Sequence, residues 1–444
     1  MQMNLLIRSS SGRLSCNSFF QSLRRSLSTS THEEEYAKRN YANNASEYHT
    51  VINSLNAQRR PYLLRHVYDD MLLDAVQPTR EIFHSLIFGT IKASSLDDAL
   101  FFRNEMRAMG YLPDVALYNF LIAACGKAKR SNHAIQIIEE LKISGVMPNA
   151  QSYICLLNSC AAAGKLDQVN SIVRDMTAAG AGLNKFCYAG LIAAHVNKRP
   201  ISEDASSKIL ELVQQSKGWA SVDAFTTAPN NVTASISDDE LYNLPTAPFA
   251  YRRGVVDKQL TVYHAAFHAS AELENIKMME ELQAMLQKDG YHPDLFIAIQ
   301  TMRCYLNADD LERGLKVFDD YMESNRVPVA ELYLELARGA MKGYSTRGMQ
   351  IALDSLMKMS SRQFYITNKY ACELLLIAAN TKVDGYTTAN YIWDLAQSRN
   401  FPLALPPVEA YYNGLREFEI PEDDARLVQV SNVYHKLKNR RFNN

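Results

Sequence analysis

The chain repeats a common pattern every 35 residues, and no other property of the sequence restricts its fold as strongly. An aromatic residue stands near the start of each of the first five units, at Tyr48, Phe83, Tyr118, Tyr153 and Tyr188. The frames that can be written around this period begin at Ala45, Arg80, Val115, Ala150, Lys185, Leu260, Leu295 and Ala330. A period of this length is typical of a repeat protein whose units bury their apolar faces only by stacking on one another.

Each unit is predicted to form two short helices. In residues 115–149, apolar side chains recur at helical spacing over 117–125 and again over 134–141, while residues 126–132 interrupt the pattern. Gly145 supplies a left-handed helix cap without Cβ strain, and Pro148 prevents the second helix from continuing. The sequence therefore predicts an all-α fold of about nine helix pairs, of which the last are divergent.

The motif Val-Ala-Leu-Tyr-Asn-Phe-Leu-Ile at 115–122, closed by Gly-Val-Met-Pro-Asn at 145–149, resembles the pentatricopeptide repeat (PPR). The tetratricopeptide repeat is excluded because its period is 34 residues and its Trp and Gly-Tyr signature is absent. The resemblance covers residues 45–217 and 260–415 and points to plain P-type repeats of a plant-like mitochondrial member. It implies a right-handed α-solenoid superhelix of helix-turn-helix repeats that binds single-stranded RNA along its concave face. It also implies a role in organellar RNA processing, stability, editing or translation.

In the PPR family, the fifth and last residues of a frame read one base, and the second residue packs against base faces. Carried over to this sequence, the fifth and last residues are His49 with Thr79, His84 with Asp114, Asn119 with Asn149, Ile154 with Asn184, His264 with Asp294, and Ile299 with Val329. Asn119 with Asn149 matches a standard pair and implies a pyrimidine. Ile154, Ile299 and Val329 lack the polar atoms that such a contact needs. We therefore expect that the base-by-base code has largely lapsed.

The second and thirteenth positions of the frames also bear on how this chain would contact RNA. The second residues, which are seldom apolar here, are Ser46, Glu81, Ala116, Gln151, Thr261 and Phe296. Lys92 and Lys127 share the thirteenth position with Lys342, near the end of the first helix, where a cation is expected to meet the RNA backbone. Glu272 takes that position in another frame. The candidate RNA-binding residues are Asn119, Asn149, His84, Asp114, His49, Thr79, His264, Asp294, Lys92 and Lys127.

Residues 1–32 have the composition of a mitochondrial presequence. They contain four Arg and nine Ser among scattered apolar side chains, without Lys, Asp or Glu. Such a positive amphipathic segment suits an import receptor and a membrane potential. We expect cleavage near residues 25–28 and residence in the mitochondrial matrix. The alternative is a disordered basic N-terminus of a cytosolic protein.

Net charge bears on the choice between functions. Between the presequence and the last ten residues, 39 Lys and Arg face 48 Asp and Glu, which is not the composition of a strongly basic nucleic-acid clamp. This balance and the lapsed code favour a non-catalytic scaffold in mitochondrial gene expression. It would belong or bind to the mitochondrial ribosome, with rRNA or mRNA and mitochondrial ribosomal proteins as partners. Two alternatives stay open: a free transcript-specific factor that binds single-stranded RNA for mRNA processing, stability or translation, and a protein-protein interaction solenoid without RNA.

An insertion divides the repeats into two arrays. Residues 218–257 are rich in Ser, Thr, Asn, Asp, Pro and Ala, which predicts a flexible loop. Its second half, from Leu241 to Arg253, interleaves aromatics with a basic pair and either docks on a partner or packs back on the solenoid. The predicted organisation is a presequence at 1–32, an N-terminal array of about five repeats at 33–217, the insertion at 218–257, a C-terminal array of about four repeats at 258–415, and a C-terminal helix with a basic tail at 416–444.

The sequence contains no complete catalytic or metal-binding motif. His264 and His268 are one helical turn apart, but the Glu of HExxH and a third ligand are missing. Cys125 and Cys160 share a column of adjacent frames, as small buried side chains between stacked helices do. No apolar run approaches the roughly 20 residues that span a bilayer. We predict no enzyme activity, cofactor, metal ion, membrane insertion or small-molecule substrate.

Overall fold

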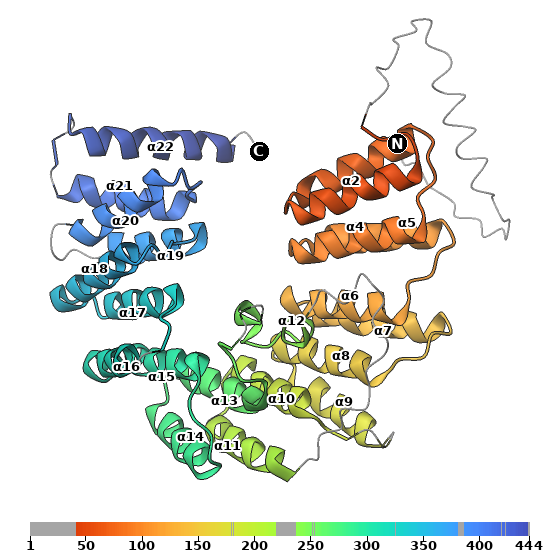
Figure 1. Cartoon of the computed structure of the whole chain (residues 1–444), viewed down its shortest axis with the longest axis horizontal. Helices are drawn as coiled ribbons and strands as arrows, with labels where there is room; N and C mark the ends of the chain where they lie inside the picture. Colours follow the sequence, from red (N-terminus) through yellow and green to blue (C-terminus); the bar gives the residue numbers. More distant parts are fainter. Residues whose placement is uncertain are drawn as a thin grey trace, which may run out of the picture. The chain divides into compact units, whose positions relative to one another are not determined.

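The computed structural model describes residues 41–178, 180, 182–218, 237–250, 252, 254–324, 326–380, 386–418, 420–421 and 423–442 (Figure 1). The predicted presequence, residues 1–32, and residues 219–236 of the insertion lie outside the described residues. In the described part every regular element is a helix, and most of the helices alternate as antiparallel pairs. The predicted all-α solenoid of helix-turn-helix repeats is confirmed.

We call the first helix of each pair its A helix and the second its B helix. The A helices are α2 (Ala45–Ala57), α4 (Arg80–Lys92), α6 (Val115–Lys127), α8 (Ala150–Ala162), α10 (Lys185–Asn197), α13 (Thr261–Glu272), α15 (Leu295–Asn307), α17 (Ala330–Lys342), α19 (Asn368–Ala379) and α21 (Leu405–Glu417). The B helices are α3 (Leu64–Leu73), α5 (Leu96–Ala108), α7 (Ser131–Ile143), α9 (Leu166–Ala178), α11 (Ala205–Gln215), α14 (Ile276–Lys288), α16 (Leu311–Glu323), α18 (Thr346–Ser361), α20 (Thr387–Ser398) and α22 (Ala425–Phe442). The described chain thus contains one helix pair more than the nine or so that the sequence predicted, because α21 and α22 also pack together.

These helices belong to two compact units. Unit 1 comprises residues 41–128 and 132–152, and unit 2 comprises residues 129–131, 153–218 and the described residues from 237 onward. Within unit 1, α4 packs against α2, α5 and α6. Within unit 2, the A helices from α10 and α13 to α21 pack on one another in chain order. Because α10 contacts α13 directly, the insertion between them leaves the stack of A helices continuous.

In at least two repeats, the aromatic column of the sequence joins an A helix to its own B helix. Tyr48 of α2 is fully buried, and its hydroxyl donates a hydrogen bond to the carboxylate of Asp74, directly after α3. In unit 2, the hydroxyl of Tyr263 in α13 donates in the same way to Asp289, directly after α14. Burial of the ring stabilises the packing of the two helices, and the carboxylate satisfies the polar end of the side chain.

The glycine column predicted to end the B helices has the expected backbone. Gly110, Gly145 and Gly290 adopt φ values of 85°, 74° and 77° at the turns that follow α5, α7 and α14. Residues with a Cβ rarely adopt this left-handed region, which closes the last helical turn and reverses the chain. The local sequence therefore sets both ends of each hairpin.

The second half of the insertion is folded onto unit 2. It contains α12 (Asp238–Leu241) and the single 3-10 turns η4 (Ala247–Phe249) and η5 (Lys258–Leu260). Leu241, Tyr242, Leu244 and Phe249 are buried, although composition indicated a flexible loop. The structure thus shows the second of the two alternatives for these aromatics, packing on the solenoid. Their partners come from helices distant in sequence, so local composition does not reveal their burial.

Candidate nucleic-acid interface

The last residue of a frame caps the A helix of the next repeat. Asp114 Oδ1 accepts a hydrogen bond from the Leu117 amide at 2.8 Å, and Asp294 Oδ1 accepts one from the Ile297 amide at 3.0 Å. Asn184 Oδ1 accepts from two amides of α10, both at 3.1 Å. Thr, Asp and Asn favour this place because the side-chain oxygen satisfies an amide that has no partner within the helix. These polar residues at the last position therefore have a structural role that does not depend on RNA.

Asn119 and Asn149, the standard code pair, lie together within unit 1. Asn119 Nδ2 is 3.4 Å from Asn149 Oδ1 and donates to Gln151 Oε1 at 3.1 Å. Asn149 Oδ1 also accepts from the Ser152 amide at 2.9 Å. Asn119 is only 1% exposed, and its Oδ1 makes no hydrogen bond among the described residues. Intramolecular bonds thus occupy most of the polar atoms with which this pair would read a base.

The His84 side chain, whose code partner is Asp114, has a buried nitrogen without a partner among the described residues. His84 lies half-buried in α4, and its Nε2 has no hydrogen-bond partner in the part of the chain that the structure describes. Burial lowers the pKa of His84, and the Asp114 carboxylate only partly opposes this shift. The imidazole is therefore neutral at pH 7, where its Nε2 can donate or accept one hydrogen bond.

The other two histidine pairs are occupied by protein contacts. His49 Nε2 lies 2.9 Å from Ser85 Oγ in α4, whereas its proposed partner Thr79 caps α4. His264 is 2% exposed, and its Nε2 lies 2.8 Å from Asp294 Oδ2. Burial disfavours the charged Asp294 carboxylate, but hydrogen bonds from His264 and two backbone amides outweigh it and lower the pKa of Asp294. The His264 pair is therefore a closed internal contact.

The A helices of unit 1 end in exposed cations. Lys92 closes α4, Lys127 closes α6, and Arg59 and Arg60 follow α2 by two and three residues. All four side chains are exposed. The two arginines were not among the predicted residues because they fall just beyond the lysine column, although their place after the first helix of a frame was a usable signal. We call Arg59, Arg60, Lys92 and Lys127 the basic row.

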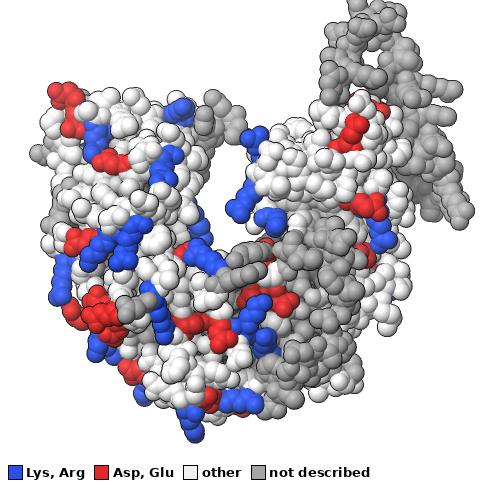
Figure 2. All heavy atoms as spheres, in the orientation of Figure 1, with Lys and Arg blue, Asp and Glu red and all other residues white. Residues whose placement is uncertain are grey.

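In unit 2 the turns that follow α13 and α15 are acidic, unlike the turn after α10, which holds Lys198 and Arg199. Glu272 and Glu274 lie at the end of α13, and Asp309 and Asp310 follow α15. Lys342 closes α17, but its Nζ is 2.6 Å from Glu274 Oε1. Among the residues coloured in Figure 2, basic and acidic side chains are interspersed over the visible face. The basic row of unit 1 therefore has no counterpart at the described turns that follow α13 and α15.

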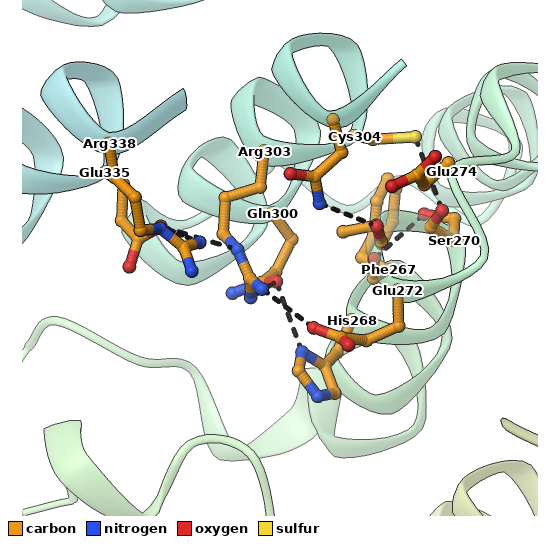
Figure 3. Close-up of polar contacts among 12 residues, drawn as sticks. Phe267, His268, Ser270, Glu272, Glu274, Gln300, Arg303, Cys304, Glu335 and Arg338 are labelled. Atoms are coloured by element: carbon orange, nitrogen blue, oxygen red, sulfur yellow. Dashed lines mark hydrogen bonds and ion pairs between the residues drawn. The ribbon is translucent and has the colours of Figure 1, made fainter. Parts of the chain in front are cut away.

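A ladder of charged side chains crosses the A helices of unit 2 (Figure 3). Arg303 Nη2 is 2.7 Å from Glu272 Oε1, and Arg303 Nε is 3.5 Å from Glu335 Oε2. Arg338 in turn pairs with Glu335 and, at 3.4 Å, with Glu373. We call these five residues the charged ladder. The sequence analysis missed it, although Arg303 and Arg338 share the ninth position of adjacent frames.

Metal ligation is not supported at the His264 and His268 pair. His268 Nδ1 lies 3.3 Å from Gln300 Oε1, whereas His264 bonds to Asp294, so the two imidazoles have different partners. In the described ranges, no group of three or more His, Cys, Asp or Glu side chains is placed to hold a metal ion. A search of the same residues for a helix long and apolar enough to cross a membrane finds none.

Buried imidazoles give the chain a predictable pH dependence. Burial lowers the pKa of His84, His195 and His268. The imidazole of an unfolded chain takes up a proton near its ordinary pKa of about 6.5, while these folded groups remain neutral there. The unfolded state then binds more protons than the native state, so the free energy of unfolding decreases as the pH falls below about 6.5.

His268→Gln is expected to reduce this loss of stability. Glutamine offers a polar group to Gln300 but does not titrate, and the neighbouring Glu272 and Arg303 remain in place. For each unit by which folding lowers the pKa of His268, the variant avoids about 1.4 kcal/mol of destabilisation at acid pH. Urea unfolding at about pH 7.5 and 5.5 measures the difference. The explanation is wrong if His268→Gln loses as much stability between these values as the wild type.

The fold and the site define a solenoid of 35-residue helical hairpins whose first A helices end in cations. Sequence models of the PPR repeat family and of the PPR repeat match residues 113–162 and 151–180. A pentatricopeptide repeat-containing protein of Arabidopsis thaliana, named as mitochondrial, is 52% identical over 407 residues, which cover 92% of this chain and 92% of that protein. The chain therefore belongs to the pentatricopeptide repeat family, as the resemblance of its repeats indicated.

More distant similarities were also found. A chloroplastic pentatricopeptide repeat-containing protein of Arabidopsis thaliana is 27% identical over 130 residues, or 29% of this chain and 12% of that one. The crystal structure of PPR10 from maize has a TM-score of 0.36 at 14% identity, covering 95% of this chain and 68% of that chain. PPR10 in complex with an 18-nt psaJ RNA element has a TM-score of 0.34 at 16% identity, covering 94% and 65%. The family assignment rests on the 52% identical relative.

Proposed function

We propose that this chain is a non-catalytic, RNA-associated PPR scaffold of mitochondrial gene expression that is a component of, or a factor bound to, the mitochondrial ribosome. Its partners are rRNA or mRNA and mitochondrial ribosomal proteins. The basic row of unit 1 carries this proposal. Four exposed cations at the ends of successive A helices favour contact with phosphates, which positions RNA without reading its sequence.

The hydrogen bonds of the fifth and last residues favour a scaffold over a factor that recognises one transcript by its sequence. Asn119 with Asn149 and His264 with Asp294 are held by intramolecular hydrogen bonds, and each Asp or Asn at the last position of these pairs also caps a helix. Reading a base there would require these bonds to be exchanged for bonds to RNA, at little net gain. His84 Nε2 has no hydrogen-bond partner among the described residues but is buried, so it too is not presented to a base.

The proposed location is the mitochondrial matrix, reached through a cleavable presequence at residues 1–32. The name of the 52% identical Arabidopsis relative and the acid-free, Arg-rich composition of this segment support that location. Within the mature chain we propose plain P-type repeats in two arrays, residues 33–217 and 258–415, joined by the insertion and followed by the C-terminal helix and basic tail.

Sedimentation of a mitochondrial lysate tests the proposal. We expect the protein to migrate with one ribosomal subunit on a sucrose gradient, to remain there in high salt, and to move to light fractions after RNase treatment. EDTA, which dissociates ribosomes, should leave it with that subunit. A light position under all conditions would contradict ribosome residence. RNA crosslinked to the light protein would then indicate the free transcript-specific factor, and the absence of RNA would indicate a protein-binding solenoid.

A further inference from the structure

The folded half of the insertion lies across the first turns of several A helices in unit 2. We call the described residues of 237–258 the strap; it begins with α12, labelled in green in Figure 1. The Tyr242 ring packs on Phe186 of α10 with centroids 4.5 Å apart. The Phe249 ring packs edge-on against Phe296 of α15 at 5.7 Å. These contacts join segments more than 40 residues apart in sequence.

The strap reaches two further A helices through polar contacts. Arg252 forms a two-pronged ion pair with Glu331 of α17, at 2.7 Å and 2.5 Å. At the other end of the strap, the Lys258 carbonyl accepts a hydrogen bond from the Thr261 hydroxyl of α13 at 2.8 Å. Bidentate pairing of a guanidinium with a carboxylate fixes direction as well as distance. The strap therefore contacts α10, α13, α15 and α17.

All four partners occupy the second position of their frames. Phe186, Phe296 and Glu331 each follow the first residue of an A helix by one, and Thr261, the first residue of α13, follows the start of its frame at Leu260 by one. The strap also reaches a last-position residue, because the Asp257 amide donates to Asp294 Oδ2 at 2.9 Å. In the resemblance described above, the second, fifth and last positions are those that face nucleotides. In these repeats the chain's own strap takes the place that RNA would need.

Burial shows how far the strap covers these positions. Phe296 is 1% exposed, whereas Phe186 and Glu331 are half-buried. The fifth-position residues His264 and Ile299 are each 2% exposed, although the fifth-position Asn119 of unit 1 is buried to the same degree without the strap. In unit 1, by contrast, the second-position residues Ser46 and Glu81 are exposed. The nucleotide-facing positions of α13 and α15 are thus covered by protein, whereas the second positions of α2 and α4 face solvent.

The surface beside the strap is also unsuited to phosphate. The charged ladder places two guanidiniums among three carboxylates, so its arginines are already neutralised (Figure 3). The strap is also covalently attached close to these helices, because η5 leads directly into α13. A short tether gives an effective concentration in the millimolar range or above, which a dissolved RNA would have to exceed.

We propose that the strap is a permanent internal substitute for nucleotides on α10, α13, α15 and α17, and that RNA contact is confined to residues 45–151 of unit 1. This inference rests on the proposed RNA association. At one base per repeat, the RNA-contacting segment is about three nucleotides long instead of about ten.

Crosslinking tests this division of the repeats. The full mature chain is irradiated with thiouridine-labelled single-stranded RNA of random sequence, and crosslinked peptides are mapped by mass spectrometry. The strap is loosened in the double variant Phe249→Ala, Arg252→Ala. The matched control is Tyr365→Ala, Arg399→Ala, which removes another aromatic and arginine contact of unit 2, at 3.7 Å. We expect crosslinks within residues 45–151 in the wild type and the matched control, with RNA affinities that agree within about twofold, and new crosslinks on α10, α13, α15 or α17 only in the strap variant.

Defined results would contradict the inference about the strap. Crosslinks on α10, α13, α15 or α17 in the wild type, where the strap is intact, would show that RNA displaces the strap and would overturn the inference. Absence of new crosslinks from the strap variant would show that the strap does not occupy nucleotide positions and would overturn it as well. Hydrogen exchange of the RNA-free wild type is an independent test of the strap. Its hydrogen bond to Asp294 should protect the Asp257 amide from exchange. Rapid exchange there in a chain that binds RNA would overturn this inference alone. Failure of every protein to bind RNA, with the strap protected, would instead overturn the proposed function and this inference with it.

Discussion

A chain in which Arg59, Arg60, Lys92 and Lys127 are all replaced by Gln is expected to bind single-stranded RNA about 100-fold more weakly than the wild type at about 0.15 M salt. Each phosphate contact releases condensed counterions, and for single strands it contributes about 0.7 to the slope of log affinity against log salt. Loss of four contacts should therefore make the slope shallower by about 3. The effect should be equal for RNAs of different sequence, because phosphates carry no base information.

Fluorescence anisotropy with labelled RNA over a series of salt concentrations measures both the affinity and the slope. The matched control replaces four exposed lysines on B helices of unit 2, namely Lys277, Lys288, Lys316 and Lys358, by Gln. It makes the same change in net charge away from the basic row. An equal weakening in the control would show that only net charge matters. An unchanged slope in the basic-row variant would show that RNA does not contact this row.

Trp393→Ala is expected to reduce the stability of unit 2 by about 3–5 kcal/mol. The indole lies in α20, is fully buried, and packs on the Tyr411 ring of α21 with centroids 5.4 Å apart. Removing it leaves a cavity between two repeats, and the neighbouring helices can fill that cavity only in part. Because stacked repeats support one another only through such interfaces, the loss should weaken the whole C-terminal end of the unit.

Trp393→Phe is the matched control. In the described part of the chain the indole Nε1 is buried without a hydrogen-bond partner, so phenylalanine removes an unsatisfied donor while keeping an aromatic ring. We expect it to cost less than about 1.5 kcal/mol. Urea unfolding followed by circular dichroism gives the overall change, and hydrogen exchange of α18 to α21 locates it. A loss below about 1 kcal/mol for Trp393→Ala would mean that this contact does not hold the last repeats together.

The strap and the basic row together suggest how a PPR solenoid becomes a scaffold. Helix caps and intramolecular pairs occupy several of the positions that would read bases, and the strap covers others in unit 2. The exposed cations of unit 1 do not depend on those positions. Contact with RNA by charge and shape can therefore persist after base reading has been lost.

Most of the fold followed from local patterns in the sequence. Helical periodicity over 117–125 and 134–141 predicted α6 and α7 within a few residues, and Gly145 predicted the turn after them. Such features depend on residues close together in the chain, where side-chain spacing and backbone preference act directly. The period of 35 then implied stacking, because a single hairpin leaves an apolar face exposed.

The site could be predicted only in part. Lys92 and Lys127 stood out by their shared column, and the structure leaves both side chains exposed. For Asn119, the sequence did not show that Gln151 would take its amide, nor that it would be 1% exposed. The identity of a polar residue does not reveal whether its hydrogen bonds go to protein or to a ligand, since both uses favour the same side chains.

The sequence by itself determined the helical hairpins, their order and their family, because each of these is encoded by short-range periodicity and caps. Only the tertiary structure decided which nucleotide-facing positions are open. Phe249 and Phe296 are 47 residues apart in the chain, and nothing near either residue specifies the other as its partner. Their contact exists because unit 2 brings the strap and α15 together, where burying both rings removes apolar surface from water.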